Sequence, residues 1–123
     1  LLFKFDSSSG FKLYYKKITL EVDYLMHYRN EQIELMPSMV RAGDNVRIKY
    51  HGLLKNAGAN EIFLYYGKDG WKHADLVRMH RDNEGFYLDV KAEADREINF
   101  CFKDSANNWD NNNGYDWKVD VYH

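Results

Sequence analysis

Cysteine, proline and long apolar runs are scarce in this sequence. It contains one cysteine, one proline and no run of about 18 apolar residues. A single cysteine cannot form a disulfide within the chain, and the position of Cys101 between Phe100 and Phe102 predicts a small buried residue rather than a reactive thiol. A membrane-spanning helix needs about 20 consecutive apolar residues, so we expect no membrane partner.

The patterns that usually accompany catalysis, metal binding or nucleic-acid binding are also missing. The five histidines show no spacing typical of a zinc site, and no glycine-rich phosphate loop or nucleophile elbow occurs. The net charge is −2, and the 17 basic residues form no stripe along the chain. No acid/base pair of a hydrolase is discernible. We therefore expect a protein that is not an enzyme and that uses no cofactor, no metal and no nucleic acid.

Aromatic residues and short alternating segments dominate instead. Aromatics make up 16% of the sequence, which is typical of β-rich domains and of stacking sites. Turn residues separate short runs of apolar and β-branched residues, and a polar loop is expected at residues 55–60. The expected strands are residues 46–50, 61–66, 76–79, 86–90, 97–102 and 115–121. This spacing predicts an all-β protein, an antiparallel β-sandwich of the immunoglobulin-like kind, within a single domain's length of chain.

The N-terminal third carries one further strand signal. Residues 18–28 form the clearest alternating run in the chain, which would place six apolar or aromatic side chains, from Ile18 to Tyr28, on one face. The single proline, Pro37, marks a boundary after this region. We therefore divide the chain into an N-terminal β extension, residues 1–35, and a sandwich, residues 36–123. An apolar strand must be covered, so we expect the extension to dock on the sandwich or to form a homodimer.

The most informative stretch is residues 100–117, FCFKDSANNWDNNNGYDW. Asn and Asp tolerate left-handed backbone angles and bond their own main chain, so residues 110–114 should form a self-satisfied turn. Trp109 has little core to enter in such a loop. An exposed indole framed by amides is typical of sugar binding, in which the ring packs on the C–H face of a pyranose.

A calcium-binding loop is the alternative for these residues. That pattern requires glycine at the sixth position, whereas Gly114 is fifth when the count starts at Asp110. Turn formation is the better interpretation. Asn111 and Asn112 are then the candidate hydrogen-bond partners of sugar hydroxyls, and Asp104 is expected to accept bonds from the loop's own N–H groups.

Two motifs in this order resemble the starch-binding carbohydrate-binding modules of families 25 and 53. The C-terminal stretch FKDSANNWDNNNGYDW is similar to the motif that closes those domains, and LYYGKDGW at residues 64–71 resembles their first motif. The resemblance covers about residues 38–123. It implies non-catalytic binding of an α-1,4-glucan, starch or glycogen, by a stacking pair, Trp71 and Trp109. Tyr65 would lie beside them at a position where the families often have histidine.

Two other interpretations of the aromatic residues stay open at this point. Trp71 and Trp109 could be core or loop-covering residues, although each follows a polar turn outside the alternating pattern. Trp117 alternates with the last strand and is expected in the core. The chain could also be an immunoglobulin-like domain for protein interaction or assembly, in which case the two tryptophans would be buried or covered by another chain.

Overall fold

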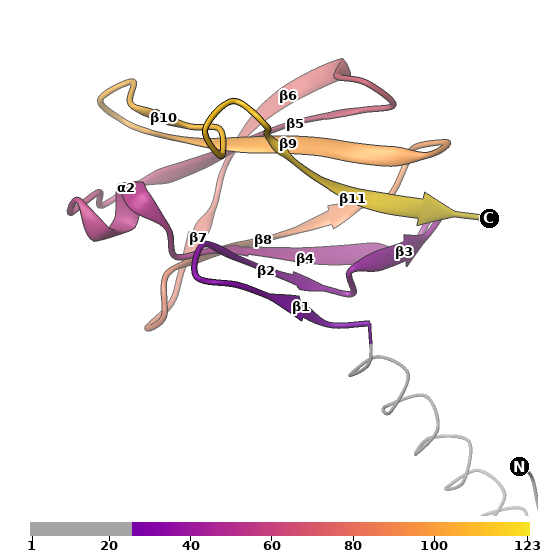
Figure 1. Ribbon diagram of the computed structural model, residues 1–123, viewed down its shortest axis with the longest axis horizontal. Helices are drawn as coiled ribbons and strands as arrows, with labels where there is room; N and C mark the ends of the chain where they lie inside the picture. The colour runs from indigo at the N-terminus through magenta and orange to yellow at the C-terminus, as the bar shows by residue number, and fades with distance from the viewer. Residues whose placement is uncertain (1–25) are drawn as a thin grey trace, which may run out of the picture.

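The computed structural model describes residues 26–123 as a sandwich of two sheets packed face to face (Figure 1). The first sheet has the strand order β1-β2-β4-β8-β7, and the second has the order β3-β11-β9-β5-β6, with β10 paired to β9. The all-β sandwich predicted from the sequence is confirmed. Within residues 26–123, no helix is long and apolar enough to span a bilayer.

The bounds of the strands match most of the expected segments. The first sheet comprises β1 (Tyr28–Arg29), β2 (Ile33–Met36), β4 (Asn45–Tyr50), β7 (His80–Arg81) and β8 (Phe86–Lys91). The second comprises β3 (Met39–Arg41), β5 (Ile62–Lys68), β6 (Lys72–Arg78), β9 (Glu97–Asp104), β10 (Trp109–Asp110) and β11 (Trp117–Tyr122). Pro37 lies where the chain leaves the first sheet and enters the second.

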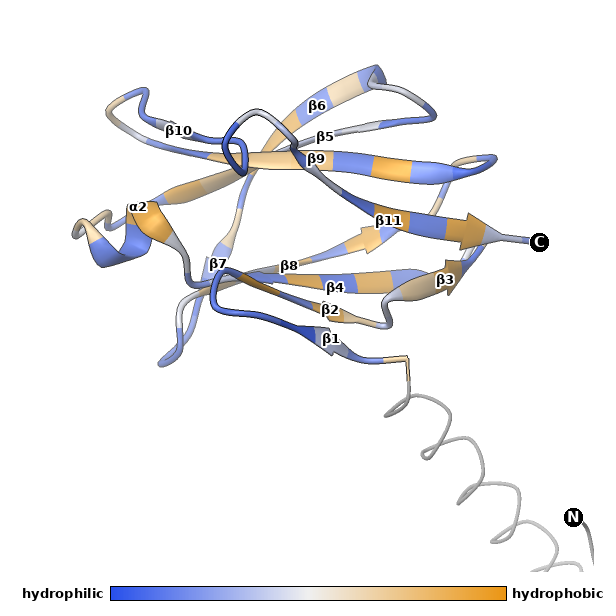
Figure 2. Cartoon of the chain, viewed as in Figure 1, coloured by the Kyte–Doolittle hydropathy of each residue, from blue (hydrophilic) through white to orange (hydrophobic). Residues whose placement is uncertain are grey.

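The core lies between the sheets and follows from the period-two alternation of the strands. Orange and blue alternate along β4, β8 and β11 in Figure 2, as expected for strands with one buried face. Its largest fully buried side chains include Tyr50, Phe100 and Phe102. The rings of Tyr50 and Phe102 stack across the two sheets, with centroids 4.1 Å apart. Trp117 is buried against Phe100 and Phe102, which confirms its predicted place in the core.

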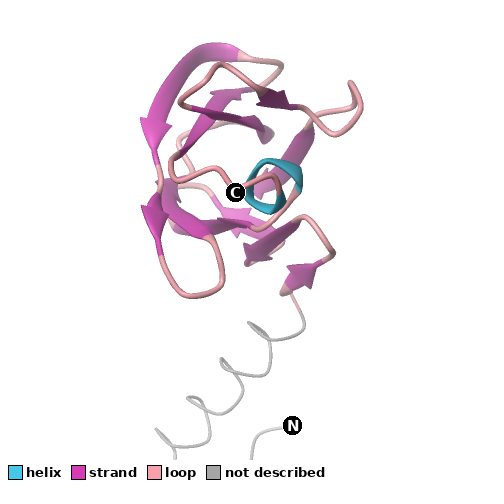
Figure 3. Ribbon diagram, turned by 90° about the vertical axis from the view of Figure 1, so that its left-hand side faces the viewer, coloured by secondary structure: helices cyan, strands magenta, loops and turns pink. Residues whose placement is uncertain are grey.

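The structure differs from the sequence expectations at two places. A short helix, α2 (Leu53–Asn56), overlaps the polar loop expected at residues 55–60 and closes one end of the sandwich (Figure 3). It forms because Leu54 is buried and its N–H donates to the hydroxyl of Tyr50. The sheets are also not purely antiparallel, since β11 and β3 pair in parallel.

Strand β1 and most of strand β2 lie before residue 36. Strand β2 pairs with β4, and β1 pairs with β2, so Ile33 and Leu35 contribute to the core. Most of the strand expected at residues 18–28 lies outside the described residues. The docking or dimerisation of residues 1–35 therefore stays a prediction.

Candidate functional site

Three aromatic side chains meet on the outer face of the six-stranded sheet. Tyr65 is at the centre: its ring stacks on Trp71 with centroids 5.4 Å apart and an interplanar angle of 22°. On the other side it meets Trp109 edge-on, at 5.6 Å and 84°. Leu64, the preceding residue of β5, is buried in the core, so the alternation of β5 directs Tyr65 outward as predicted. We call Tyr65, Trp71 and Trp109 the aromatic platform.

The turn between β5 and β6 holds Trp71 in a conformation that tryptophan rarely adopts. Its φ angle is +68°, in the left-handed region that costs a non-glycine residue about 1–2 kcal/mol. The side-chain oxygen of Asn99, on β9, accepts hydrogen bonds from the backbone N–H groups of Gly70 and Trp71, at 2.9 and 3.0 Å. These bonds fix the turn, so the sheet itself determines where the Trp71 ring lies.

Gly67 allows this turn to fold back closely on β5. A Cβ atom at residue 67 would lie 2.9 Å from the Cα of Trp71 and 3.0 Å from its carbonyl carbon. Real Cβ contacts are essentially never that short, so only glycine leaves room for the backbone of Trp71.

Asp69 anchors the same turn to the loop that precedes β9. Its carboxylate accepts hydrogen bonds from the backbone N–H groups of Asp95, Arg96 and Glu97. The bonds from Asp95 and Arg96 are the chief cause that lowers the pKa of Asp69 below its ordinary value, because they stabilise the charged form. The turn that carries Trp71 is thus held from two sides.

Trp109 is held by a second device, a tight hairpin between β9 and β10. Strand β10 pairs with β9, with Trp109 opposite Lys103. One carboxylate oxygen of Asp104 accepts from the N–H groups of Ala106 and Asn108, and the other accepts from the Asn108 side chain. The bonds from Asn108 are the largest cause that lowers the pKa of Asp104. The expected structural role of Asp104 is confirmed, whereas strand β10 within the polar stretch was not predicted.

Asp110, the next residue, ties the platform to the core. Its carboxylate is buried and accepts a 2.6 Å hydrogen bond from the hydroxyl of Tyr50. Burial is the first cause that raises the pKa of this hydroxyl, and the bond to Asp110 raises it further. The side chains of Trp109 and Asp110 alternate about β10, so the buried carboxylate fixes which way the indole points. Trp109 itself is 49% exposed, and Trp71 and Tyr65 are partly buried.

The Asn-rich loop forms the self-satisfied turn that the sequence predicts. Asn112 and Asn113 have left-handed φ angles, of 58° and 56°. The side-chain oxygen of Asn111 accepts from the N–H of Gly114, and the side-chain amide of Asn112 donates to the carbonyl of Asp116. Each of the two asparagines therefore uses part of its hydrogen-bonding capacity within the loop. The Asn111 side chain is exposed, and that of Asn112 is partly exposed.

Several residues around the platform were not identified from the sequence. Asn99 and Gly67 have no local signal, because their importance arises only when the turn folds onto β9 and β5. Lys103 places its ammonium 5.0 Å from the Phe63 ring and 5.9 Å from the Trp109 ring, which puts a positive charge beside the platform. Cys101 lies opposite Tyr65 in the sheet and is buried, and burial raises the pKa of its thiol to about 12.

The chemistry available at this site is stacking combined with hydrogen bonding. Among residues 26–123, no group of three or more His, Cys, Asp or Glu side chains is arranged to hold a metal ion. The platform offers aromatic faces beside the ammonium of Lys103, and the exposed side chains of Asn111 and Asn113 follow Trp109 closely in the chain. This combination suits a ligand with both apolar faces and hydroxyl groups.

Comparisons with known proteins point to carbohydrate binding. Residues 46–100 match the family model described as a starch/carbohydrate-binding module, family 53. The matched range contains Tyr65 and Trp71, together with Gly67 and Asn99, which hold the turn that carries Trp71. Trp109 and the Asn-rich loop lie outside it.

The chain is also similar to an alpha-amylase of Clostridium acetobutylicum. The two are 30% identical over 107 residues, which is 85% of this chain and 14% of the relative. The chain thus spans about a seventh of the length of that enzyme. No solved structure gives a significant match. The two similarities together support a carbohydrate-binding module of the starch-binding kind, and they do not favour a domain for protein interaction or assembly.

Proposed function

We propose that this chain binds α-glucan, starch or glycogen, without catalysing a reaction on it. In this proposal the aromatic platform stacks on glucose rings of an α-1,4-glucan polysaccharide or oligosaccharide, and Asn111 and Asn112 bind sugar hydroxyls. The match to a family described as a binding module supports the absence of catalysis. The similarity to part of an alpha-amylase supports the α-linked substrate class.

The observation that carries the proposal is the inclination of the platform rings. Tyr65 is nearly parallel to Trp71 and nearly perpendicular to Trp109, so the two indole planes are steeply inclined to each other. A cellulose chain is flat and is matched by a row of coplanar rings. An α-1,4-glucan curves, and successive glucose units can contact rings that face in different directions.

The platform is built before any ligand arrives, which favours binding. Base–ring stacking, used here as an analogy, contributes about 1–3 kcal/mol per aromatic face. Flexible rings would lose part of that contribution to the entropy of ordering. Asn99 and Asp104 hold the two turns that carry Trp71 and Trp109. The rings are therefore already ordered in the folded protein, and little further conformational entropy is lost on binding.

Within this proposal the two regions of the chain have different roles. Residues 36–123 carry the glucan site, and residues 1–35 dock on the sandwich or take part in a homodimer. A dimer would present two platforms to a polymer that repeats the same sugar, which raises avidity without new contacts. Light scattering on the full chain should give twice the mass of 14.7 kDa. A mass of one chain at high micromolar concentration would exclude the dimer and leave the glucan site unaffected.

Affinity electrophoresis tests the binding directly. The full chain should migrate more slowly in native gels that contain soluble starch or glycogen, and at its ordinary rate in gels that contain hydroxyethyl cellulose. Trp71→Ala and Trp109→Ala should each restore much of the mobility in starch. Tyr28→Ala is the matched control, because Tyr28 is 44% exposed but lies on the opposite sheet. Equal retardation by starch and hydroxyethyl cellulose, or none by either, would refute the proposed ligand.

A further inference from the structure

A row of four side chains crosses the outer face of the second sheet and ends at the aromatic platform. In the strand registers, Phe63 of β5 is opposite Arg78 of β6 on one side and opposite Lys103 of β9 on the other. Lys103 is in turn opposite Trp109 of β10. We call Arg78, Phe63 and Lys103 the basic row, which meets the platform at Trp109.

The basic row points to the same side of the sheet as the platform. Phe63 alternates with Ile62 and Leu64, which are both fully buried in the core. The ammonium of Lys103 lies 5.0 Å from the centroid of the Phe63 ring and 5.9 Å from the centroid of the Trp109 ring. Phe63 itself is partly exposed. The row therefore presents an aromatic ring and a cation beside the platform.

The ammonium of Lys103 has hydrogen-bonding capacity that the fold does not use. It carries three donors and donates one of them to the carbonyl of Asp104, at 2.8 Å. Within residues 26–123, the lysines that form ion pairs are Lys49, Lys91 and Lys118, and Lys103 is not among them. Two N–H groups of a full positive charge are thus available to a ligand next to Trp109.

Arg78 supplies further donors at the other end of the row. Its neighbour Val77 packs against the core, so the alternation of β6 directs Arg78 outward, opposite Phe63. The side chain is 66% exposed, and its Nε lies 3.4 Å from the carboxylate of Glu61. A guanidinium has five N–H donors, so this ion pair leaves most of them available. The exposed carboxylate of Glu61 adds an acceptor.

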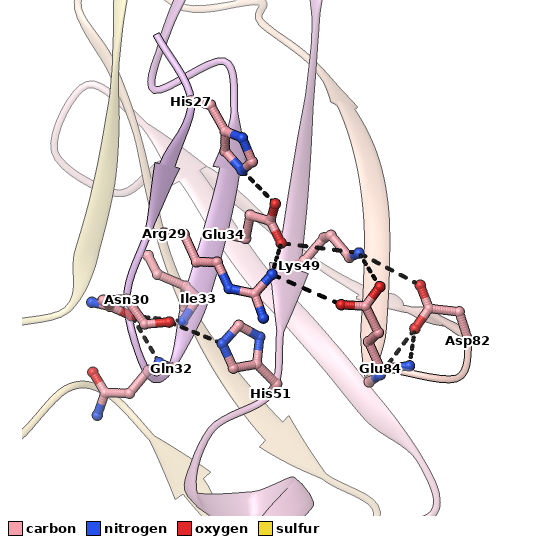
Figure 4. Close-up of polar contacts among 11 residues, drawn as sticks. His27, Arg29, Asn30, Gln32, Ile33, Glu34, Lys49, His51, Asp82 and Glu84 are labelled. Carbon is pink, nitrogen blue, oxygen red and sulfur yellow. Dashed lines mark hydrogen bonds and ion pairs between the residues drawn. The ribbon is translucent and has the colours of Figure 1, made fainter. Parts of the chain in front are cut away.

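The charged side chains on the outer face of the other sheet pair with one another instead. Figure 4 shows the carboxylate of Glu34 in ion pairs with Arg29 and Lys49, at 3.3 and 4.0 Å. Lys49 also reaches Glu84, at 3.8 Å. The cations of that face are matched by carboxylates within the fold, whereas Lys103 has no such partner in the described part of the chain. This difference favours the basic row as a surface that binds a ligand.

We infer that the basic row is a further subsite for α-glucan, which binds the glucosyl units that follow those on the platform. This subsite rests on the proposed function and extends it. A glucan chain that passes Tyr65 along β5 next reaches Phe63, two residues and about 7 Å away. The donors of Lys103 and Arg78 come from the two neighbouring strands, each about 4.8 Å from β5. Sugar hydroxyls both donate and accept hydrogen bonds, so they can use these donors and the carboxylate of Glu61 together.

Calorimetric titration of the full chain with a short and a long oligosaccharide tests the inference. Maltotriose is expected to occupy the platform, and maltoheptaose is long enough to reach the basic row as well, so the unaltered chain should bind maltoheptaose more tightly. Lys103→Met and Arg78→Gln should each weaken maltoheptaose binding about two- to tenfold, as expected for one lost hydrogen bond, and leave maltotriose binding unchanged. Trp71→Ala should weaken the binding of both.

Lys49→Met and Arg29→Gln are the matched controls, because they remove the same charges from the outer face of the other sheet. Both controls should leave the two affinities unchanged, whatever their effect on the melting temperature. Equal affinity of the unaltered chain for the two oligosaccharides would overturn the subsite, as would an unchanged ratio of the two affinities in both row variants.

A further outcome separates the subsite from a purely positioning role. If Lys103→Met weakens both oligosaccharides equally, Lys103 acts by orienting Trp109, and the subsite is overturned. If the unaltered chain binds neither oligosaccharide, the proposed function itself is refuted, and the subsite with it. Binding of both oligosaccharides that depends on Trp71 but not on the basic row would leave the proposed function intact and remove only the subsite.

Discussion

Replacing Gly67 by alanine should weaken glucan binding without touching an aromatic side chain. The added Cβ would lie 2.9 Å from the Cα of Trp71, whereas ordinary van der Waals contact begins at 3.4 Å. The neighbouring atoms belong to the backbone of Trp71 and Lys72, so no flexible side chain can move aside. The turn must therefore retreat from β5 by about 0.5 Å, which strains its bonds to Asn99.

The size of the effect follows from these contacts. Overpacking of this kind costs about 1–3 kcal/mol of folding stability. A displaced Trp71 would forfeit part of the roughly 1–3 kcal/mol that a stacked ring contributes. A loss of about 1 kcal/mol corresponds to about fivefold weaker binding. We expect Gly67→Ala to bind glycogen about five- to tenfold more weakly than the unaltered chain does. This holds at a measurement temperature well below the melting temperature of the variant, where the variant is folded.

Isothermal titration at 15 °C, with circular dichroism to verify folding, measures this change. Ile48→Val is a suitable control because Ile48 is fully buried in β4 of the other sheet. It should cost about 0.5–1.5 kcal/mol of stability and leave the affinity unchanged. If Gly67→Ala loses stability but binds as tightly as the unaltered chain, Trp71 does not contact the glucan.

Three further predictions concern the supports of the platform. Tyr50→Phe should lower the free energy of unfolding by about 1–3 kcal/mol in a denaturant titration, because buried Asp110 loses its bond from the Tyr50 hydroxyl; an unchanged midpoint would contradict that role. The folded-state pKa values of Asp69 and Asp104 are lowered, so their stabilisation is present above the unfolded value near 3.8 and is lost as the pH falls through the lower folded values. Starch retention should therefore be constant from pH 5 to 8 and should decline below about pH 4; a decline near pH 6 would point to other groups. A chelator should change neither the melting temperature nor starch retention, because the loop that begins at Asp110 does not have glycine at the sixth position of the calcium-binding pattern. A shift of several degrees in the melting temperature would refute this.

The fold could be predicted because its signals are local. Alternation in residues 46–50 and 86–90 and the turn chemistry between strands determine which side chains are buried, and these features are visible in the sequence. Helix α2 was missed because it depends on a tertiary contact: the buried Tyr50 hydroxyl accepts the N–H of Leu54. The parallel pairing of β3 with β11 was missed for a similar reason, since it joins residues about 80 apart.

The platform residues and the supporting Asp104 were singled out from the sequence, but the other supports were not. Tyr65, Trp71 and Trp109 stood out because they follow turns or alternate away from the core. Asn99 resembles any polar residue of a strand until the turn that contains Trp71 folds onto it. Gly67 likewise gives no signal beyond being a glycine near a strand end. The sequence therefore singles out the rings and Asp104, and the structure adds the other groups that orient the rings.

Calorimetric titration of the full chain with maltoheptaose, and with cellohexaose as the β-linked comparison, tests the central claim most directly. The account predicts saturable binding of maltoheptaose and none of cellohexaose. It also predicts at least tenfold weaker binding by Trp109→Ala, at an unchanged melting temperature, and unchanged binding by Tyr28→Ala. Maltoheptaose binding that survives Trp109→Ala intact, or a large loss of melting temperature in that variant, would contradict the assignment of this platform as the glucan site.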